Sequence, residues 1–187
     1  MKKKITKKIV SISATIVLLF FLGLPVTAQS SEDFKLKYFV DEFGDATKDA
    51  YLNAIVKGLF SNSATTDSDL YVSVLISKYE ISLGLFEYGS SLVKGNSYTN
   101  YMVKMKLPNG EVIEDKIVLD KRINRFILSD ALYWRKSDLV IFDGVSSAKF
   151  LIYDKERESN NYLFSIVFPS MDYIVEKLGG KPSWYIE

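Results

Sequence analysis

The sequence predicts a mainly β domain of the α+β class, an antiparallel, sandwich-like arrangement that ends in a C-terminal helix. Three observations indicate this fold. Apolar and polar residues alternate with the two-residue period of strands over much of the chain. Clusters of turn-forming residues separate these stretches. Only residues 171–178, near the C-terminus, combine helical spacing of apolar residues with helix-capping residues at both ends.

The N-terminal 28 residues resemble a secretory signal and are set apart from the domain. Five lysines precede an apolar stretch over residues 9–24, Pro25 ends it, and Val26 and Ala28 are small residues at the positions that signal peptidase recognises. The alternative is a membrane anchor, but the apolar stretch is about 16 residues and a spanning helix needs ~20. We therefore expect cleavage after Ala28, a single β-rich domain over residues 29–187, and a secreted or periplasmic location without a membrane span after signal removal.

Composition excludes several kinds of chemistry. The chain has no Cys and no His, which excludes disulfides, thiolate nucleophiles, Cys-type zinc sites and imidazole bases. We expect no cofactor and no enzymatic activity, because no recognisable catalytic motif is present. The signal segment carries five of the 24 basic residues and no acid, so the mature chain has 19 basic against 23 acidic groups. No Lys/Arg stripe stands out, and we expect no nucleic-acid partner.

Four strands are expected in the first half of the mature domain. The alternation is clearest over residues 70–76, where Leu70, Val72, Val74 and Ile76 share one face. The expected strands are 35–40, 51–60, 70–76 and 81–85. The expected connections are a polar loop over 41–49, a turn over 61–69, a tight connection over 78–80 and a loop over 89–96.

A β-hairpin is predicted in the middle of the chain. Residues 101–107 and 112–119 alternate as strands on either side of Pro108-Asn109-Gly110. Pro presets the first turn position and Gly supplies the positive φ that a three-residue loop requires. We therefore expect a positive φ at Gly110.

The last third combines strands with helix. Residues 126–128 form a short apolar run, and residues 149–153 and 162–168 are expected strands. A helix should follow, with Ser170 as its N-cap and Gly179 at its C-terminus. The segment Asp138–Asp143 fits either a strand or one short helix before the last two strands, because six residues are too few for periodicity to decide.

Several motifs resemble a family of small, exported, uncharacterised bacterial proteins. Residues 41–47 read DEFGDAT and are followed by Tyr51, similar to that family's "DEFGDPTG…Y" opening. LFSNSATT at 59–66 and LFEYG at 85–89 are similar to its next two motifs. The chain departs from the pattern at Ala46, where the family has Pro, and at Lys48, where it has Gly. The resemblance implies export and a shared fold but no activity, so no catalytic residue is carried over.

The C-terminal third resembles the ending of VasI-type accessory proteins of type VI secretion. The shared features are the strand at 149–152, the residues Phe164-Ser165-Ile166 and the helix at 173–178. In those proteins a short helix precedes the last two strands. This resemblance favours the helix for Asp138–Asp143.

Acidic side chains give two candidate sites. Asp41 and Asp45 are calcium candidates, because hard cations prefer clustered oxygen ligands on a bent loop and Gly44 permits the bend. The spacing matches no EF-hand, and the alternative is a polar loop whose side chains cap backbone groups. Paired carboxylates could instead hydrolyse glycans. The acids considered for that pair are Glu87, Glu111, Glu114 and Asp115.

The functional prediction is an exported, non-catalytic binding or structural module of the cell envelope or extracellular space, with an unknown protein or glycan partner. The alternative is a carboxylate-dependent glycan hydrolase. Tyrosines around two strands could form a ligand platform, although β-propensity and core filling explain tyrosines in sheets equally well. The tyrosines considered are Tyr71, Tyr79, Tyr88, Tyr98 and Tyr101. A cleft with two facing acids would favour the enzyme, and an unblocked edge strand would favour binding.

Overall fold

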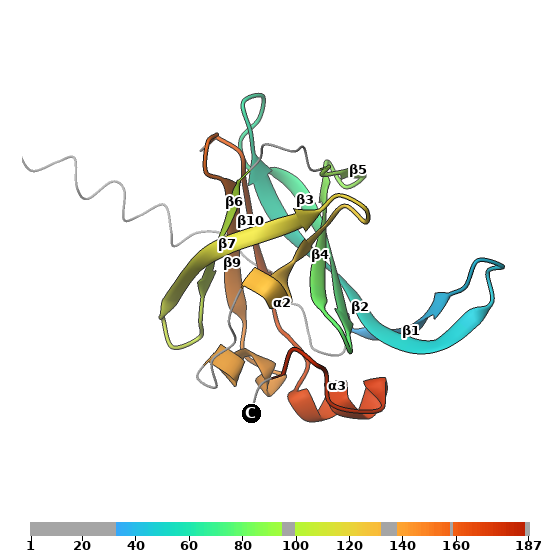
Figure 1. The fold of residues 1–187 in the computed structure, drawn as a ribbon. Helices are drawn as coiled ribbons and strands as arrows, with labels where there is room; N and C mark the ends of the chain where they lie inside the picture. Colours follow the sequence, from blue (N-terminus) through green and yellow to red (C-terminus); the bar gives the residue numbers. More distant parts are fainter. Residues whose placement is uncertain (1–32, 95–99, 132–137, 158, 186–187) are drawn as a thin grey trace, which may run out of the picture.

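The computed structural model describes residues 33–94, 100–131, 138–157 and 159–185. Figure 1 shows them as one β-barrel with a hairpin projecting from its side. The strands are β1 (Lys35–Val40), β2 (Ala46–Ser61), β3 (Ser68–Ser77), β4 (Ile81–Glu87), β5 (Ser91–Leu92), β6 (Tyr101–Lys106), β7 (Val112–Asp120), β8 (Arg125–Ile127), β9 (Ala148–Asp154) and β10 (Asn161–Ile166). The helices are α2 (Leu128–Ala131), the 3₁₀ helix η2 (Asp138–Asp143) and α3 (Met171–Leu178).

The sheet closes on itself, so the prediction of a sandwich is wrong. Eight antiparallel strands follow the order β2-β10-β9-β6-β7-β8-β4-β3, and β3 pairs back onto β2. Closure depends on β2, which pairs with β3 along one edge and with β10 at residues 58–61 along the other. A barrel and a sandwich both alternate inward and outward residues, so the two-residue period alone does not distinguish them.

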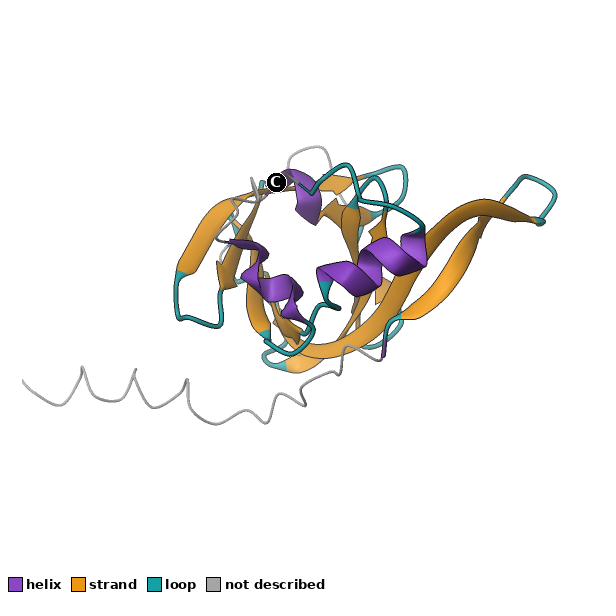
Figure 2. Cartoon of the chain, turned by 90° about the horizontal axis from the view of Figure 1, so that it is seen from below, coloured by secondary structure: helices purple, strands orange, loops and turns teal. Residues whose placement is uncertain are grey.

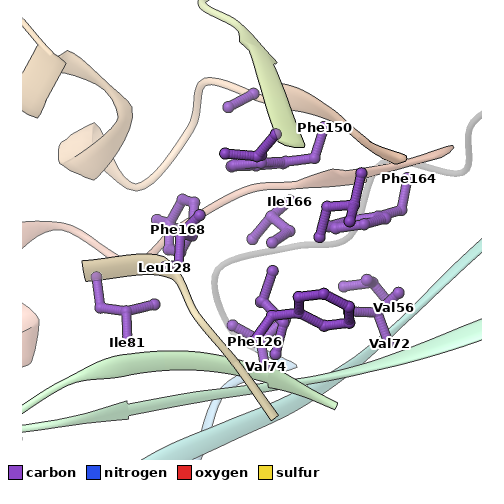
Figure 3. Close-up of a cluster of buried hydrophobic side chains, with 14 of the residues drawn as sticks. Val56, Val72, Val74, Ile81, Phe126, Leu128, Phe150, Phe164, Ile166 and Phe168 are labelled. Carbon is purple, nitrogen blue, oxygen red and sulfur yellow. The ribbon is translucent and has the colours of Figure 1, made fainter. Parts of the chain in front are cut away.

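The barrel interior is a packed core. Leu70, Val72, Val74 and Ile76 are fully buried, as their alternation predicts. Figure 3 shows large side chains from facing strands meeting in the middle of the barrel. Neighbouring strands contribute as well: Phe150 of β9 is opposite Phe164 of β10, and their stacked rings have centroids 5.4 Å apart. Eight strands enclose a space that side chains can fill, and here they fill it.

Helix α3 lies with η2 at the lower end of the barrel as drawn in Figure 1, and Figure 2 looks along the barrel from that end. The predicted caps are confirmed: Ser170 Oγ accepts a hydrogen bond from the N–H of Tyr173 (3.3 Å), and Gly179 has a φ of 69°. Beyond the helix, Trp184 is buried and donates from Nε1 to the carbonyl of Ser77 (2.9 Å). Its ring also packs on Phe142 of η2, which closes this end.

The predicted β6–β7 hairpin is confirmed. Gly110 has a φ of 90°. The N–H of Leu107 donates to the carbonyl of Glu111 (2.8 Å), and Asn109 Oδ1 accepts from the N–H of Glu111 (2.9 Å). These bonds bracket the three-residue loop that the sequence indicates. The β3–β4 hairpin also lies where predicted, with residues 78–80 as its connection.

Two segments needed the structure for their assignment. Asp138–Asp143 is the short helix η2, which the resemblance to VasI-type proteins favours. The predicted loop over 41–49 is wrong in its second half, because β2 already begins at Ala46. Residues 46–50 show little apolar alternation, and backbone pairing with β1 holds them in a strand instead.

Residues 1–28, including the predicted cleavage site after Ala28, lie outside the described residues, as does Tyr98. Within the described ranges, the helices are too short or too polar to cross a membrane.

Candidate functional site

The projecting hairpin is the most unusual feature of the described surface. β1 pairs with β2 from Val40 opposite Ala46 to Lys35 opposite Asn53. The barrel strands β3 and β10 pair with β2 only from Tyr51 onward. The hairpin therefore leaves the barrel, as Figures 1 and 2 both show. We call residues 35–50 the arm.

The tip of the arm is organised by Asp41. Its Oδ1 accepts hydrogen bonds from the backbone N–H groups of Phe43 (2.9 Å) and Asp45 (3.0 Å). Its own N–H donates to the carbonyl of Asp45 (2.9 Å), and Gly44, with a φ of 88°, turns the chain. These contacts are those of an Asx turn, in which the Asp side chain replaces a backbone partner. The tip is thus a built loop that presents Phe43.

Large hydrophobic side chains are exposed along the arm. Phe43 is 82% exposed, Val40 65% and Tyr38 50%, and Leu36 and Phe39 are also exposed. Isolated surface hydrophobics are normal, whereas a contiguous group of them indicates an interaction site. These five lie within eight consecutive residues on a segment that contributes little to the core. They make the arm the leading candidate for a binding surface.

The free edge of β1 carries features that discourage strand addition. Lys35 and Lys37 lie on it, and the register shifts between Tyr38 and Val40. Lysines and bulges are the usual means by which edge strands avoid pairing with other chains. We therefore expect a partner to contact the arm's side chains rather than to extend its sheet.

The calcium candidates Asp41 and Asp45 both lie at this tip. The Asp41 carboxylate is engaged by the two backbone N–H groups named above, and Asp45 contributes its backbone to the same loop. Across the described ranges, no group of three or more His, Cys, Asp or Glu side chains is arranged to hold a metal ion. The role in which the structure places Asp41 is structural, and calcium binding at Asp41 and Asp45 stays a prediction.

The acids considered for glycan hydrolysis lie on different parts of the barrel. Glu87 faces inward at the upper end, where it accepts a hydrogen bond from the hydroxyl of Tyr162 (2.9 Å). Glu114 lies on the outer face of β7, accepts from the hydroxyl of Tyr153 and pairs with Lys104 at 3.5 Å. The other two acids are Glu111, in the β6–β7 turn, and Asp115, on β7.

The electrostatics at Glu114 do not suit acid catalysis of glycoside cleavage. The hydrogen bond from Tyr153 and the charge of Lys104 keep the pKa of Glu114 below its usual value. A glycosidase needs a carboxylic acid whose pKa is raised, so that it still holds a proton at neutral pH. At the other site, burial and then the charge of Glu87 raise the pKa of Tyr162, which keeps that phenol neutral.

The tyrosines considered for a ligand platform do not all share one surface. Tyr79 lies in the β3–β4 turn, and Tyr88 follows the opposite end of β4. Tyr101 is buried inside the barrel, and Tyr71 is half-buried on its outer face. Tyr88 packs edge-on against Phe60, with ring centroids 4.9 Å apart.

A second surface becomes visible only in the folded chain. On the outside of the barrel, Leu163 of β10 is opposite both Leu59 of β2 and Leu151 of β9. In the same sheet, Lys106 of β6 is opposite Lys149 of β9. We call this surface the lysine–leucine face. It comprises Leu59, Leu151, Leu163, Lys104, Lys106, Lys116 and Lys149.

The sequence alone, in which no Lys/Arg stripe stands out, does not reveal this cluster. Its members come from strands that lie up to about a hundred residues apart, so no local stripe exists. The one local signal is the alternation of Lys104 and Lys106 with buried Val103 and Met105, which assigns both lysines to the outer face.

Comparison of the chain with models of protein families, with curated proteins and with solved structures gives no match. The resemblances stated above therefore stay predictions.

Proposed function

We propose that this chain is an exported, non-catalytic binding module of the cell envelope or extracellular space, and that its arm docks a protein partner. The observation that carries the proposal is the run of exposed hydrophobic side chains at 36–43, ending in Phe43 at 82% exposure. Keeping such side chains in water is unfavourable, so a partner that covers them gains apolar burial.

A protein is a better match to the arm than a small molecule. Small ligands bind in concave sites, whereas Phe43 and Val40 lie on a projecting hairpin. Protein interfaces, in contrast, are centred on aromatic anchors that enter a pocket of the partner. The glycan-hydrolase alternative has less support, because Glu114 is held ionised on the outside while Glu87 faces inward.

Export forms the second part of the proposal and rests on residues 1–28. Mass spectrometry of the released protein should find a chain that begins at Gln29. Intact Met1 on membrane-bound protein would contradict cleavage and would favour the anchor.

The docking proposal is tested by photo-crosslinking in intact cells. A photoreactive phenylalanine analogue replaces Phe43 in the full chain, and a matched control carries it at Val145, which is 80% exposed in the loop after η2. We expect a discrete protein adduct from position 43 and none from position 145, because exposure is matched and only position 43 lies on the arm.

The adduct must also correspond to measurable binding. The purified wild-type chain should bind the crosslinked partner, Phe43→Ser should lose that binding, and Val145→Ser should keep it. Equal crosslinking from both positions, or no adduct from position 43, would refute the arm as a docking element.

A further inference from the structure

We infer that the arm of one copy docks on the lysine–leucine face of a second copy, so that the chain assembles head to tail. This inference rests on the proposed docking role of the arm and names its partner. It is carried by the matching chemistry of two surfaces that lie apart on the same molecule.

The arm tip is acidic around an apolar centre. Asp41, Glu42 and Asp45 flank Phe43 in the sequence, and residues 41–45 contain no basic side chain. Phe43 is the most exposed large hydrophobic side chain among the described residues. A surface that receives this tip should therefore be apolar at its centre and positively charged at its margin.

The lysine–leucine face has that composition along one of its sides. Leu59, Leu163 and Leu151 stand side by side across three strands and are partly exposed. Lys106 and Lys149 follow on the adjacent row and give that side of the leucines its positive charge. The two ends of the leucine row continue into acids, Asp69 opposite Leu59 and Glu114 opposite Lys104.

The lysines of this face are incompletely neutralised within one copy. Like charges directly opposite each other across a sheet are destabilising, and Lys106 is opposite Lys149. Among the described residues, neither of these two lysines forms an ion pair, whereas Lys104 is 3.5 Å from Glu114. An acidic partner on this face would relieve the repulsion that the isolated copy retains.

The arm does not reach the face of its own copy. Figure 1 shows the arm leaving one side of the barrel while β6, β7 and β9 form the opposite side. The contact must therefore join different copies through two different surfaces. Such heterologous contacts leave one arm and one face free at the ends, so assembly continues unless it closes into a ring.

Anionic lipid is the alternative to a second copy as the partner of these lysines. A membrane would also attract Lys106 and Lys149. It would, however, repel the carboxylates of the arm tip and would leave Phe43 uncovered. Docking of a second copy would cover Phe43 of one copy and neutralise the lysines of the other in a single contact.

The test uses sedimentation velocity on the purified full chain over a range of concentrations. The arm variant combines Glu42→Lys with Phe43→Ser, and the face variant combines Lys106→Glu with Lys149→Glu. A control, Lys94→Glu with Lys121→Glu, changes the net charge as the face variant does, at exposed lysines away from the face. Thermal melts should show that all variants remain folded, because every changed side chain is on the surface.

We expect wild type and control to grow beyond dimers as concentration rises and to dissociate as salt is added. The arm variant by itself and the face variant by itself should each stay monomeric. Mixed in equal amounts, the arm variant and the face variant should form a 1:1 dimer and nothing larger, because one intact arm meets one intact face and the remaining surfaces are blocked.

Other outcomes overturn the inference in distinguishable ways. A wild type that stays monomeric refutes it, and crosslinking of Phe43 to a different protein would then leave the proposed docking role standing. Self-association of the face variant alone, which keeps an intact arm, would indicate an arm-to-arm contact, and assembly of wild type without any dimer in the mixture would also refute the arm-to-face contact. Monomeric wild type that binds phosphatidylglycerol vesicles, with binding lost in the face variant, would assign the lysines to a membrane.

Discussion

The barrel and the arm share one strand, and β2 has a different character in each. Within the barrel, Leu52, Ala54, Val56 and Phe60 of β2 point inward and are buried, and strands pair with both of its edges. Within the arm, residues 46–50 pair with β1 alone, and all six residues of β1 are exposed.

This difference separates two reasons for apolar side chains in a strand. In the barrel they are explained by the core that they fill, and their loss should reduce stability. On the arm nothing within the described part of the chain covers Phe43 or Val40, so the stability of one copy does not account for them. The arm is the region where apolar residues are better explained by binding than by folding.

The sharpest version of this comparison replaces one phenylalanine in each region. Phe150 is fully buried between Phe164 and Phe168, so Phe150→Ala should lower the free energy of unfolding by about 3–5 kcal/mol. Phe43→Ala should change it by no more than about 0.5 kcal/mol, as is usual for exposed positions. Urea denaturation of dilute protein, where copies do not meet, measures both values.

Similar losses in the free energy of unfolding for Phe150→Ala and Phe43→Ala would contradict the distinction between the barrel and the arm. They would mean that Phe43 is covered within its own copy and that the arm is a part of the core. A small loss for Phe150→Ala would instead mean that the barrel interior repacks easily, which its stacked and edge-on rings argue against.

The sequence predicted those parts of the barrel that local pattern determines. The β3 and β6 strands, the Gly110 turn and the caps of α3 follow from the identity of residues that are neighbours in the chain. Closure did not follow, because it depends on β10 pairing with β2 about a hundred residues earlier. Alternation records which face is buried and not which strand lies beside it.

The candidate site was less predictable than the fold. Residues 41–49 were expected to be a loop because their polar composition suits one, and only pairing with β1 extends β2 back to Ala46. Exposure of Leu36, Tyr38 and Val40 is likewise a property of the folded chain, since the same alternating residues in a central strand would be buried. Lys149 and Lys106 are brought opposite each other only by the pairing of β6 with β9.

A cation in each region gives a second, smaller contrast. Arg125 lies on the outer face of the barrel, where its guanidinium donates to Ser82 Oγ (2.9 Å) and to the backbone carbonyls of Ser73 (2.7 Å) and Ser82 (3.0 Å). On the arm, Lys37 Nζ is 3.4 Å from Asn53 Oδ1 at an exposed position. Arg125 thus ties three strands together, and Lys37 adds one weak contact.

Replacing each cation by Met keeps an unbranched, flexible side chain, somewhat shorter, and removes the charge and the hydrogen-bond donors. Arg125→Met should cost about 1.5–3 kcal/mol, the range for hydrogen bonds to a charged group. Lys37→Met should stay within about 0.5 kcal/mol. The same denaturation measurement applies to both, and an Arg125→Met variant as stable as wild type would show that the barrel does not depend on this contact.

The smallest expected change in stability comes from substitutions in the two hairpin turns, and it is the change most specific to each region. Gly44 at the tip of the arm and Gly110 in the barrel have φ values of 88° and 90°, and in both an added Cβ would meet nothing within 4 Å. Valine at either position therefore introduces backbone strain of about 1–3 kcal/mol without a clash. What differs is the structure that must open to relieve that strain.

Opening the Gly110 turn separates β6 from β7 and breaks the barrel, so Gly110→Val should lower the melting temperature. The tip around Gly44 pairs only within the arm, so the arm can open while the barrel remains folded. Gly44→Val should then leave the melting temperature unchanged but speed amide exchange at Asp41 and Asp45, whose N–H groups are hydrogen-bonded in the tip. Equal losses of melting temperature would mean that the arm and the barrel unfold as one unit. Exchange that stays slow in Gly44→Val would mean that the tip is held by contacts beyond its own hairpin.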